Sequence, residues 1–293
     1  MSARWRNDDH STSLRITAST DERLLNNLSR LQKWRDRLTR KARKYRTRWQ
    51  ERLRPIVLKN PGWCPICEQR TTFVARDAWL RDHYKCLRCA SIPRERALME
   101  VIQQRFPNWP TLTIHESSPG NRGASRRFAT ECRHYIPSQF FPDKPLGSVI
   151  GSYRCENLEQ LTFEDESIDL HVSQDVMEHV LRPARAFAEI ARTLKPGGAH
   201  VFTVPLVNKD SPSKMRIEVD EGGALIYLVP PEYHGSPIDA KGSLVTIDWG
   251  FDIHEHIAAA CGLETEIIRL DDLSKGIRAE YIEVLVTRKP ANA

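Results

Sequence analysis

The feature that most constrains this chain is a pair of Cys-x2-Cys sequences, Cys64/Cys67 and Cys86/Cys89, separated by 18 residues. Two-residue spacing in a tight turn lets both thiolates point at one centre. Two such turns complete an all-thiolate tetrahedron around zinc, with Zn–S distances of about 2.3 Å. Because roughly 30 residues cannot bury a sufficient core unaided, the metal would supply folding energy. The pattern therefore predicts zinc bound by these four cysteines; the alternative is four buried cysteines without metal.

Residues 61–92 are accordingly expected to form a zinc ribbon, in which a short hairpin brings the two cysteine turns together. Thr72, Phe73 and Val74 supply strand-forming residues in the interval. Zinc ribbons serve as structural clamps, nucleic-acid readers and docking surfaces. The pattern thus identifies the metal and leaves the role of the module open.

Positive charge is concentrated before this module. The net charge is +6, but residues 1–60 hold 17 Lys+Arg against 6 Asp+Glu, which leaves residues 61–293 at −5. After a polar stretch over 1–20, apolar residues recur at helical steps and predict one long helix over 21–54. We expect residues 1–60 to form a basic helical arm and linker. Its apolar stripe packs on the body or on a second copy, or its basic face binds RNA or an anionic surface.

The sequence also bears on location. It contains no apolar run of about 18 residues, so no transmembrane segment is expected. The first residues lack the apolar core of a secretory signal, which favours a cytoplasmic location. In such a compartment, paired cysteines indicate a metal site and not a disulfide framework.

From residue 93 onward, helical and strand patterns alternate. The expected helices are 94–106, 183–194 and 252–261, and the expected strands are 111–115, 168–173, 199–205, 264–270 and 281–287. Asp252 and Glu255 have the spacing of a capping box, and Gly262 is placed to end the last helix. Alternation of this kind predicts a doubly wound α/β fold, with a mostly parallel sheet between helices.

Residues 158–205 carry a more specific pattern. An L-x-F-x-D-x-S-I-D sequence approaches one strand, Glu178-His179 follows it, and E-I-x-R-x-L-K-P-G-G precedes the next strand. This segment resembles class I S-adenosylmethionine-dependent methyltransferases of the type 11 group, and the resemblance covers residues 93–293. It implies a seven-stranded Rossmann-like sheet with S-adenosylmethionine as the cofactor. With the cysteine module, the chain looks like a zinc-ribbon subgroup of these enzymes.

The resemblance also implies cofactor-binding residues. Glu116 keeps the acid that ends the first strand, but Ser118 and Arg122 stand where two glycines are usual, and only Gly120 is retained. Gln139 stands where an acid usually accepts from both ribose hydroxyls, and an amide can accept one bond and donate another. The full set implied is Glu116, Ser117, Ser118, Gly120, Gln139, Glu156, Asn157, Gln174 and Asp175. The alternative is a turn that no longer admits the cofactor.

Methyl transfer requires a nucleophile in line with the methyl–sulfur bond, and a hydroxyl nucleophile benefits from a general base. The candidate bases are His179, His234 and Asp248. For His179 the alternative is a structural histidine, and for His234 it is a turn residue. Asp175, Glu178 and His179 are also spaced to share one helix face, where they would bind a divalent ion or form a hydrogen-bonded cap.

Three functions remain open at this stage. The leading one is methyl transfer to an oxygen of a small-molecule or saccharide-like acceptor, because S-Q-D-V replaces the (N/D)PPY sequence that base-directed enzymes often carry. The second is an RNA methyltransferase that binds RNA through the zinc ribbon and the basic arm. The third is a non-catalytic scaffold with a degenerate cofactor fold.

Overall fold

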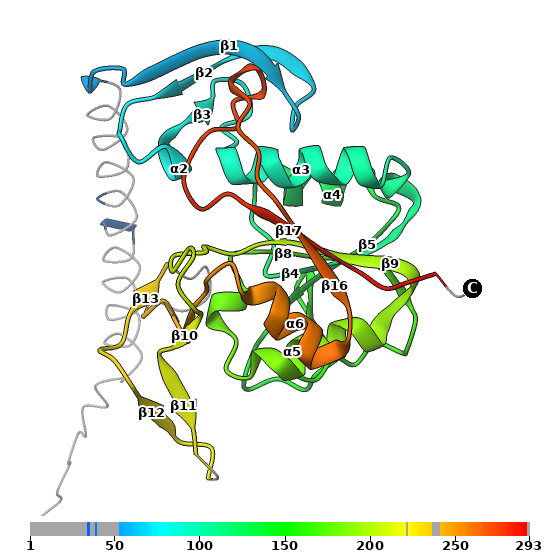
Figure 1. Cartoon of the computed structure of the whole chain (residues 1–293). Helices are drawn as coiled ribbons and strands as arrows, with labels where there is room; N and C mark the ends of the chain where they lie inside the picture. The colour runs from blue at the N-terminus through cyan, green and yellow to red at the C-terminus, as the bar shows by residue number, and fades with distance from the viewer. Residues whose placement is uncertain (1–33, 36–38, 40–52, 221, 236–240, 292–293) are drawn as a thin grey trace, which may run out of the picture. The chain divides into compact units, whose positions relative to one another are not determined.

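The computed structural model describes residues 34–35, 39, 53–220, 222–235 and 241–291 (Figure 1). The polar stretch and most of the helix expected over 21–54 lie outside these residues. Met1–Arg54 and Pro55–Ala293 are two separate units, and the features described below belong to the second. No helix in the described part of the chain is both long and apolar enough to cross a membrane.

A mixed sheet of eight strands forms the centre of the second unit, in the order β16-β17-β9-β8-β4-β5-β7-β6. The strands are β4 (Thr113–Ser117), β5 (His134–Gln139), β6 (Val149–Ile150), β7 (Tyr153–Cys155), β8 (Ile168–Gln174), β9 (Leu194–Thr203), β16 (Glu264–Ile268) and β17 (Val284–Arg288). The five central strands from β9 to β7 run parallel, whereas β17 is antiparallel to both neighbours. The sheet has one strand more than the seven expected, and its shortest edge strand, β6, folds back antiparallel on β7.

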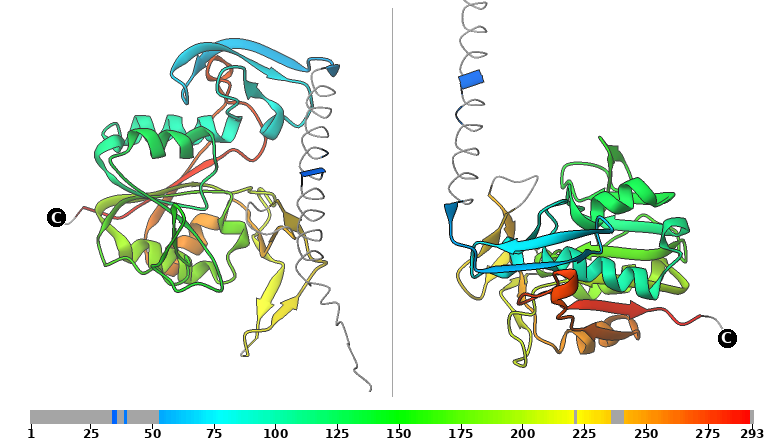
Figure 2. Two further views of the ribbon diagram at one scale, coloured as in Figure 1. Left: turned by 180° about the vertical axis from the view of Figure 1, so that it is seen from behind. Right: turned by 90° about the horizontal axis from the view of Figure 1, so that it is seen from above.

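Helices cover both faces of this sheet, which confirms the doubly wound arrangement. The helices are α3 (Pro93–Arg105), α4 (Gly123–Glu131), α5 (Pro183–Thr193) and α6 (Ile253–Cys261), with 3-10 turns η1 (Trp109–Thr111), η2 (Met177–His179) and η3 (Leu273–Lys275). α3 and α4 lie on one face and α5 and α6 on the other (Figures 1 and 2). Each face has its own apolar cluster, represented by Phe128 on the first and Trp249 on the second.

Helix α6 gives one confirmed expectation and one wrong one. Gly262 ends the helix in the left-handed conformation, at φ 72°, as predicted. The capping box is absent, because the Asp252 side chain makes no bond to the first turn of the helix. Its carboxylate instead accepts from the backbone N–H of Ser213 at 2.9 Å and from the Ser213 hydroxyl at 2.6 Å. A tertiary partner has replaced the local one.

The carboxyl end of the sheet is where a ligand is expected. The chain leaves β4 towards β5 and β7 on one side, and then crosses back so that β8 pairs with β4 on the other side. In doubly wound sheets, ligands bind outside the carboxyl ends of the strands at such a reversal. The ends of β4, β5 and β8 therefore mark the candidate site.

The cysteine module is a three-stranded antiparallel sheet that shares a core with the α/β body. It comprises β1 (Leu58–Cys64), β2 (Gln69–Ala75), the short helix α2 (Leu80–His83) and β3 (Lys85–Cys86), so its first strand begins within the expected linker. Phe73 and Tyr84 are fully buried in the same apolar cluster as α3. Arg96 of α3 donates to the carbonyl oxygens of Gly276, at 3.0 Å, and Tyr84, at 2.8 Å. The module is thus built into the body.

The long segment between β9 and α6 is not structureless. It contains three small two-stranded sheets, formed by β10 (Lys214–Met215) with β15 (Ile247–Asp248), β11 (Ile217–Val219) with β12 (Leu225–Tyr227), and β13 (Tyr233–His234) with β14 (Ser243–Leu244). Thr246 joins the segment to η2, because its backbone N–H donates to the carbonyl oxygen of Glu178 at 2.8 Å and its hydroxyl donates to that of Val180 at 2.7 Å. This segment covers one side of the candidate site.

Candidate active site

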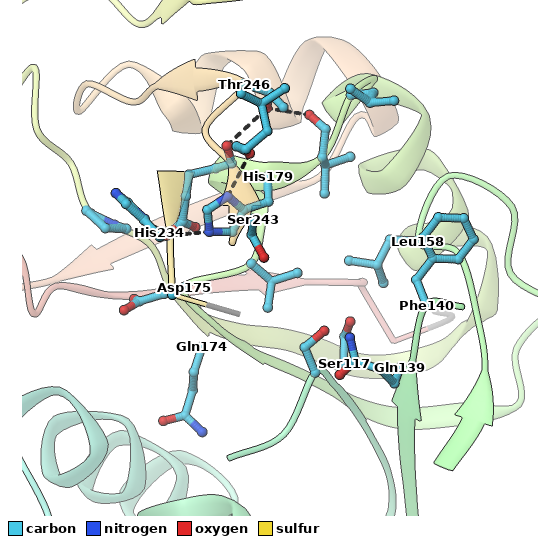
Figure 3. Close-up of a pocket in the computed structure, with 18 of the residues that line it drawn as sticks. Ser117, Gln139, Phe140, Leu158, Gln174, Asp175, His179, His234, Ser243 and Thr246 are labelled. Atoms are coloured by element: carbon cyan, nitrogen blue, oxygen red, sulfur yellow. Dashed lines mark hydrogen bonds and ion pairs between the residues drawn. The ribbon is translucent and has the colours of Figure 1, made fainter. Parts of the chain in front are cut away.

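A cavity of about 930 Å³ lies at the carboxyl ends of the parallel strands. Its volume is at the upper end of the range usual for small-molecule sites. Ser117, Gln139 and Gln174 line it from the ends of β4, β5 and β8, and His179 and His234 line another part (Figure 3). The cavity therefore joins the expected cofactor residues to two of the expected catalytic residues.

The turn after β4 has the backbone conformation of a glycine-rich turn, although its first position is Ser118 and not glycine. Ser118 has φ 52°, in the left-handed region that side chains other than glycine seldom adopt. Gly123 has φ 60°, and a Cβ there would lie 2.4 Å from the carboxyl carbon of Glu95. Arg122 turns away and pairs with Glu95 at 3.0 Å, and it does not line the cavity. Gly123, not singled out from sequence, is thus the position where glycine is required.

Glu116 lies behind the cavity wall and not in it. Its buried carboxylate accepts from Ser125 Oγ at 2.6 Å, from the Tyr135 hydroxyl at 2.7 Å and from Gln174 Nε2 at 2.9 Å. Burial raises the pKa of the Glu116 carboxyl to about 7. The nearby Gly120 donates its backbone N–H to Ser125 Oγ and also stays outside the cavity lining. In this structure Glu116 and Gly120 support the turn, whereas Ser117 and Ser118 face the cavity.

Glu156 and Asn157, two of the expected cofactor residues, line the cavity beyond the end of β7. Glu156 is buried and already ion-paired with Arg154, and it also accepts from the backbone N–H of Thr162 at 2.9 Å. Phe140, which follows Gln139, adds an exposed aromatic ring to the same wall. This part of the cavity combines polar acceptors with an apolar surface, the combination that a nucleoside requires.

Asp175 ends β8 in a left-handed conformation, at φ 54°, and meets two arginines that sequence analysis did not identify. Arg81 of the cysteine module approaches its carboxylate at 2.7 Å, and Arg94 of α3 at 3.2 Å. Burial opposes ionisation, yet Arg94 and Arg81 hold the pKa of Asp175 below its ordinary value. Because both arginines line the cavity, the cysteine module contributes directly to its wall.

His179 and His234 both line the cavity and contact each other edge to face, with ring centroids 5.2 Å apart. His179 comes from η2, and its Nδ1 lies 2.8 Å from the carbonyl oxygen of Leu244, to which it donates. Burial lowers the pKa of His179, so the ring stays neutral at neutral pH. Glu178 lies between them and is almost fully buried. Burial, and then the charge of Asp175, raise the pKa of Glu178 well above its ordinary value.

Two sequence expectations about the residues near His179 and His234 were wrong. Asp248 does not line the cavity; it pairs with Arg216 at 2.8 Å. The trio of Asp175, Glu178 and His179 does not share a helix face, because residues 177–179 form a 3-10 turn and the Asp175 carboxylate is held by arginines. The side chain that joins Glu178 and His179 is instead that of His234.

The four cysteines of the module converge. Sγ of Cys64 lies 3.7 Å from that of Cys89, Sγ of Cys67 lies 4.0 Å from that of Cys86, and all four lie within 4.8 Å of one another. A tetrahedral zinc with Zn–S distances of about 2.3 Å separates its sulfur ligands by about 3.8 Å. The four sulfur atoms are therefore close enough to one another to share one metal ion.

Part of the chain is similar to known proteins. Residues 130–202 match the family model described as a methyltransferase domain. A 50-residue segment is 46% identical to dimethylglycine N-methyltransferase of Parasynechococcus marenigrum (strain WH8102), covering 17% of this chain and 18% of that protein. The match thus spans about a fifth of the length of that curated relative.

Similar solved structures have low identity to the chain. One is an S-adenosylmethionine-dependent methyltransferase from Mesorhizobium loti, with 17% identity and a TM-score of 0.41 over 66% of this chain and 97% of that one. Another is the 1,6-didemethyltoxoflavin-N1-methyltransferase of Burkholderia thailandensis, crystallised with 1,6-didemethyltoxoflavin and S-adenosylhomocysteine. It has 13% identity and a TM-score of 0.38 over 67% of this chain and 78% of that one.

Proposed function

We propose that this protein is an S-adenosylmethionine-dependent methyltransferase that acts on an oxygen of a small-molecule or saccharide-like acceptor. The observation that carries the proposal is one continuous cavity in which the β4 turn and the His179–His234 pair both take part. The methyltransferase-domain match over residues 130–202 and the segment shared with a methyltransferase of a small molecule support it.

The residues present suit the cofactor. Ser117 and Ser118 offer hydroxyl groups to its amino-acid part, and the left-handed backbone at Ser118 opens the turn as glycine would. We assign the ribose to Gln139 and the adenine side to Glu156 and Asn157, which all line the cavity. When bound, S-adenosylmethionine supplies an electrophilic methyl group on sulfur. The chain's part is to align the acceptor with that methyl and to exclude water from it.

We assign activation of the acceptor to His179 and His234. His179 is held neutral by burial, so its Nε2 keeps a lone pair at neutral pH. His234 is half-buried at the same end of the cavity. The cysteines are assigned a structural zinc that fixes the wall from which Arg81 reaches Asp175.

Calorimetry with S-adenosylhomocysteine is the first test, and one site per chain is expected. Mass spectrometry of extracts incubated with isotope-labelled cofactor then identifies the acceptor and shows whether the new bond is to oxygen or nitrogen. Absence of both binding heat and a thermal shift would overturn the proposal and favour a non-catalytic scaffold.

RNA is the second candidate acceptor, favoured by the excess positive charge of residues 1–60. It predicts nucleic acid that co-purifies with the protein and is lost on deletion of residues 1–54, which precede the second unit. It also predicts binding that weakens steeply with salt. Equal activity of the deleted and full-length proteins on the identified acceptor would exclude a role of the arm in acceptor binding.

A further inference from the structure

We propose that Glu178, His179 and His234 form a second metal site, which takes Zn²⁺ or a similar divalent transition-metal ion and leaves one coordination position open to the cavity. One ligand atom from each residue lies within 4.8 Å of the other two. Glu178 Oε1 is 3.8 Å from His179 Nε2 and 3.9 Å from His234 Nδ1. Four-coordinate zinc holds such atoms about 3.4 Å apart, so each of these two distances must shorten by about half an ångström on binding.

The strongest evidence is the state of Glu178. Its side chain is 3% exposed, and neither carboxylate oxygen has a hydrogen-bond partner among the residues that the structure describes. A buried carboxylate without a partner is strongly unfavourable, and pairing or metal coordination removes the penalty. The charges of Arg81 and Arg94 act on Glu178, but both arginines form their ion pairs with Asp175. A cation between Glu178 and the two histidines supplies what the protein itself does not.

The histidines are oriented as metal ligands are. His179 donates from Nδ1 to the Leu244 carbonyl oxygen, which leaves the lone pair of Nε2 directed towards Glu178. His234 turns Nδ1 towards Glu178, while its Nε2 lies 3.7 Å from a carboxylate oxygen of Glu232. Ligand histidines commonly use one ring nitrogen for the metal and the other for a carbonyl or carboxylate group. His179 shows this arrangement, and at His234 the carboxylate of Glu232 lies near the second nitrogen but beyond hydrogen-bond distance.

The site is open on one side. All three residues line the cavity, and three protein ligands leave a further position on zinc for a molecule in it. Two imidazoles and one carboxylate favour zinc and its first-row neighbours over magnesium. This differs from the cysteine cluster, where four thiolates complete the coordination.

The use of the open position rests on the proposed function. A hydroxyl of the acceptor that binds the metal there becomes more acidic and loses its proton to solvent. Its oxygen then forms the new bond to the methyl group of S-adenosylmethionine, while the methyl–sulfur bond breaks and its electron pair stays on sulfur. S-adenosylhomocysteine and the methyl ether are the products. His179 and His234 then act as metal ligands and not as proton acceptors.

The test measures the zinc content of the full-length protein after dialysis against Zn²⁺ alone and gel filtration. Two zinc ions per chain are expected for the native sequence, one for each cluster. His234→Ala and Glu178→Gln should each retain one, with affinity for the second ion at least tenfold weaker. His254→Ala, which removes an exposed histidine on α6, is the matched control and should retain two.

One zinc per native chain, or two in His234→Ala, would overturn the metal site. His234 is half-buried, so this variant remains informative if Glu178→Gln does not fold. Competition with Mg²⁺ should not displace the second ion. Binding of S-adenosylhomocysteine is measured in the same samples. If the native protein binds S-adenosylhomocysteine but only one zinc ion, the metal site alone is refuted. If the native protein does not bind S-adenosylhomocysteine, the proposed function is refuted.

Discussion

Two buried carboxylates, Asp175 and Glu178, lie three residues apart in the wall of the active-site cavity and have different partners. Asp175 meets Arg81 and Arg94, and the pKa of its carboxyl is lowered. Glu178 lies near two histidines and, among the described residues, forms no ion pair with an arginine; the pKa of its carboxyl is raised. Asp175 thus has two cationic partners within ion-pair distance, whereas Glu178 has none that is always charged. The protein itself therefore neutralises the charge of Asp175, whereas the metal ion proposed above would neutralise that of Glu178.

The largest expected effect comes from unfolding the cysteine module, which carries Arg81, the partner of Asp175. Stripping zinc from the cysteines with a strong chelator should raise hydrogen exchange throughout residues 58–90, because structural zinc contributes folding energy directly. Since Arg81 belongs to this module, binding of S-adenosylhomocysteine should fall as well. Unchanged exchange would contradict the four-cysteine zinc site. Unchanged nucleoside binding after exchange had risen would show that it does not depend on the folded module.

Acidification should produce the next largest effect. It tests groups whose pKa is shifted by burial and not by an ion pair. His115, His171 and His200 are buried in the sheet, and burial lowers the pKa of each, to about 3 for His115 and His200. Their folded pKa values lie below the unfolded value of about 6.5, so their stability contribution is present above that pH and is lost as pH falls. By pH 5.5, the protonation of each histidine on unfolding should lower the free energy of unfolding by about 1.4 kcal/mol, and that of the three together by roughly 4 kcal/mol.

Urea denaturation between pH 7.5 and 5 measures this effect. A variant such as His200→Gln should show a shallower loss, because it removes one of the three groups that bind protons only when unfolded. Burial raises the carboxyl pKa of Glu116 and Glu178, so these two groups oppose the loss and the native profile alone is not decisive. Equal pH dependence of the native protein and His200→Gln would mean that His200 is not held neutral.

Arg81→Ala should make Asp175 resemble Glu178. Removing one partner of a buried ion pair typically destabilises a protein by about 3–5 kcal/mol, and Arg94 still faces Asp175, so the lower value is expected. The measurement is the free energy of unfolding in urea at pH 7. Arg70→Ala, which removes an exposed arginine of the same module, is the control and should change it by less than about 0.5 kcal/mol. Equal effects of the two would show that the Asp175 pair contributes little.

The smallest effect concerns the support of the cofactor turn. Glu116→Ala removes the acceptor that holds Ser125 and Gln174, and should weaken S-adenosylhomocysteine binding at least about tenfold, or about 1.4 kcal/mol. Calorimetry measures it, with Glu164→Ala at an exposed position as the control. Native affinity in Glu116→Ala would place the cofactor elsewhere in the cavity.

Local patterns in the sequence were sufficient for much of the fold. The two Cys-x2-Cys turns, the alternation of strands and helices and the Gly262 helix end all depend on residues close together in the chain. Such signals survive in sequence because a turn, a helical face or a helix end is determined by neighbours within a few positions. The extra edge strand β6, only two residues long, was below what periodicity detects.

Tertiary structure decided the partners of the polar side chains. Asp252 has capping-box spacing but bonds Ser213, because the segment before α6 packs against it. Asp175 finds Arg81 from 94 positions away, and Glu178 finds His234 instead of completing a helix face with Asp175. No sequence period encodes these pairs. They arise because packing brings distant segments to the same end of the sheet, where burial makes each unpaired polar group unfavourable enough to select its partner.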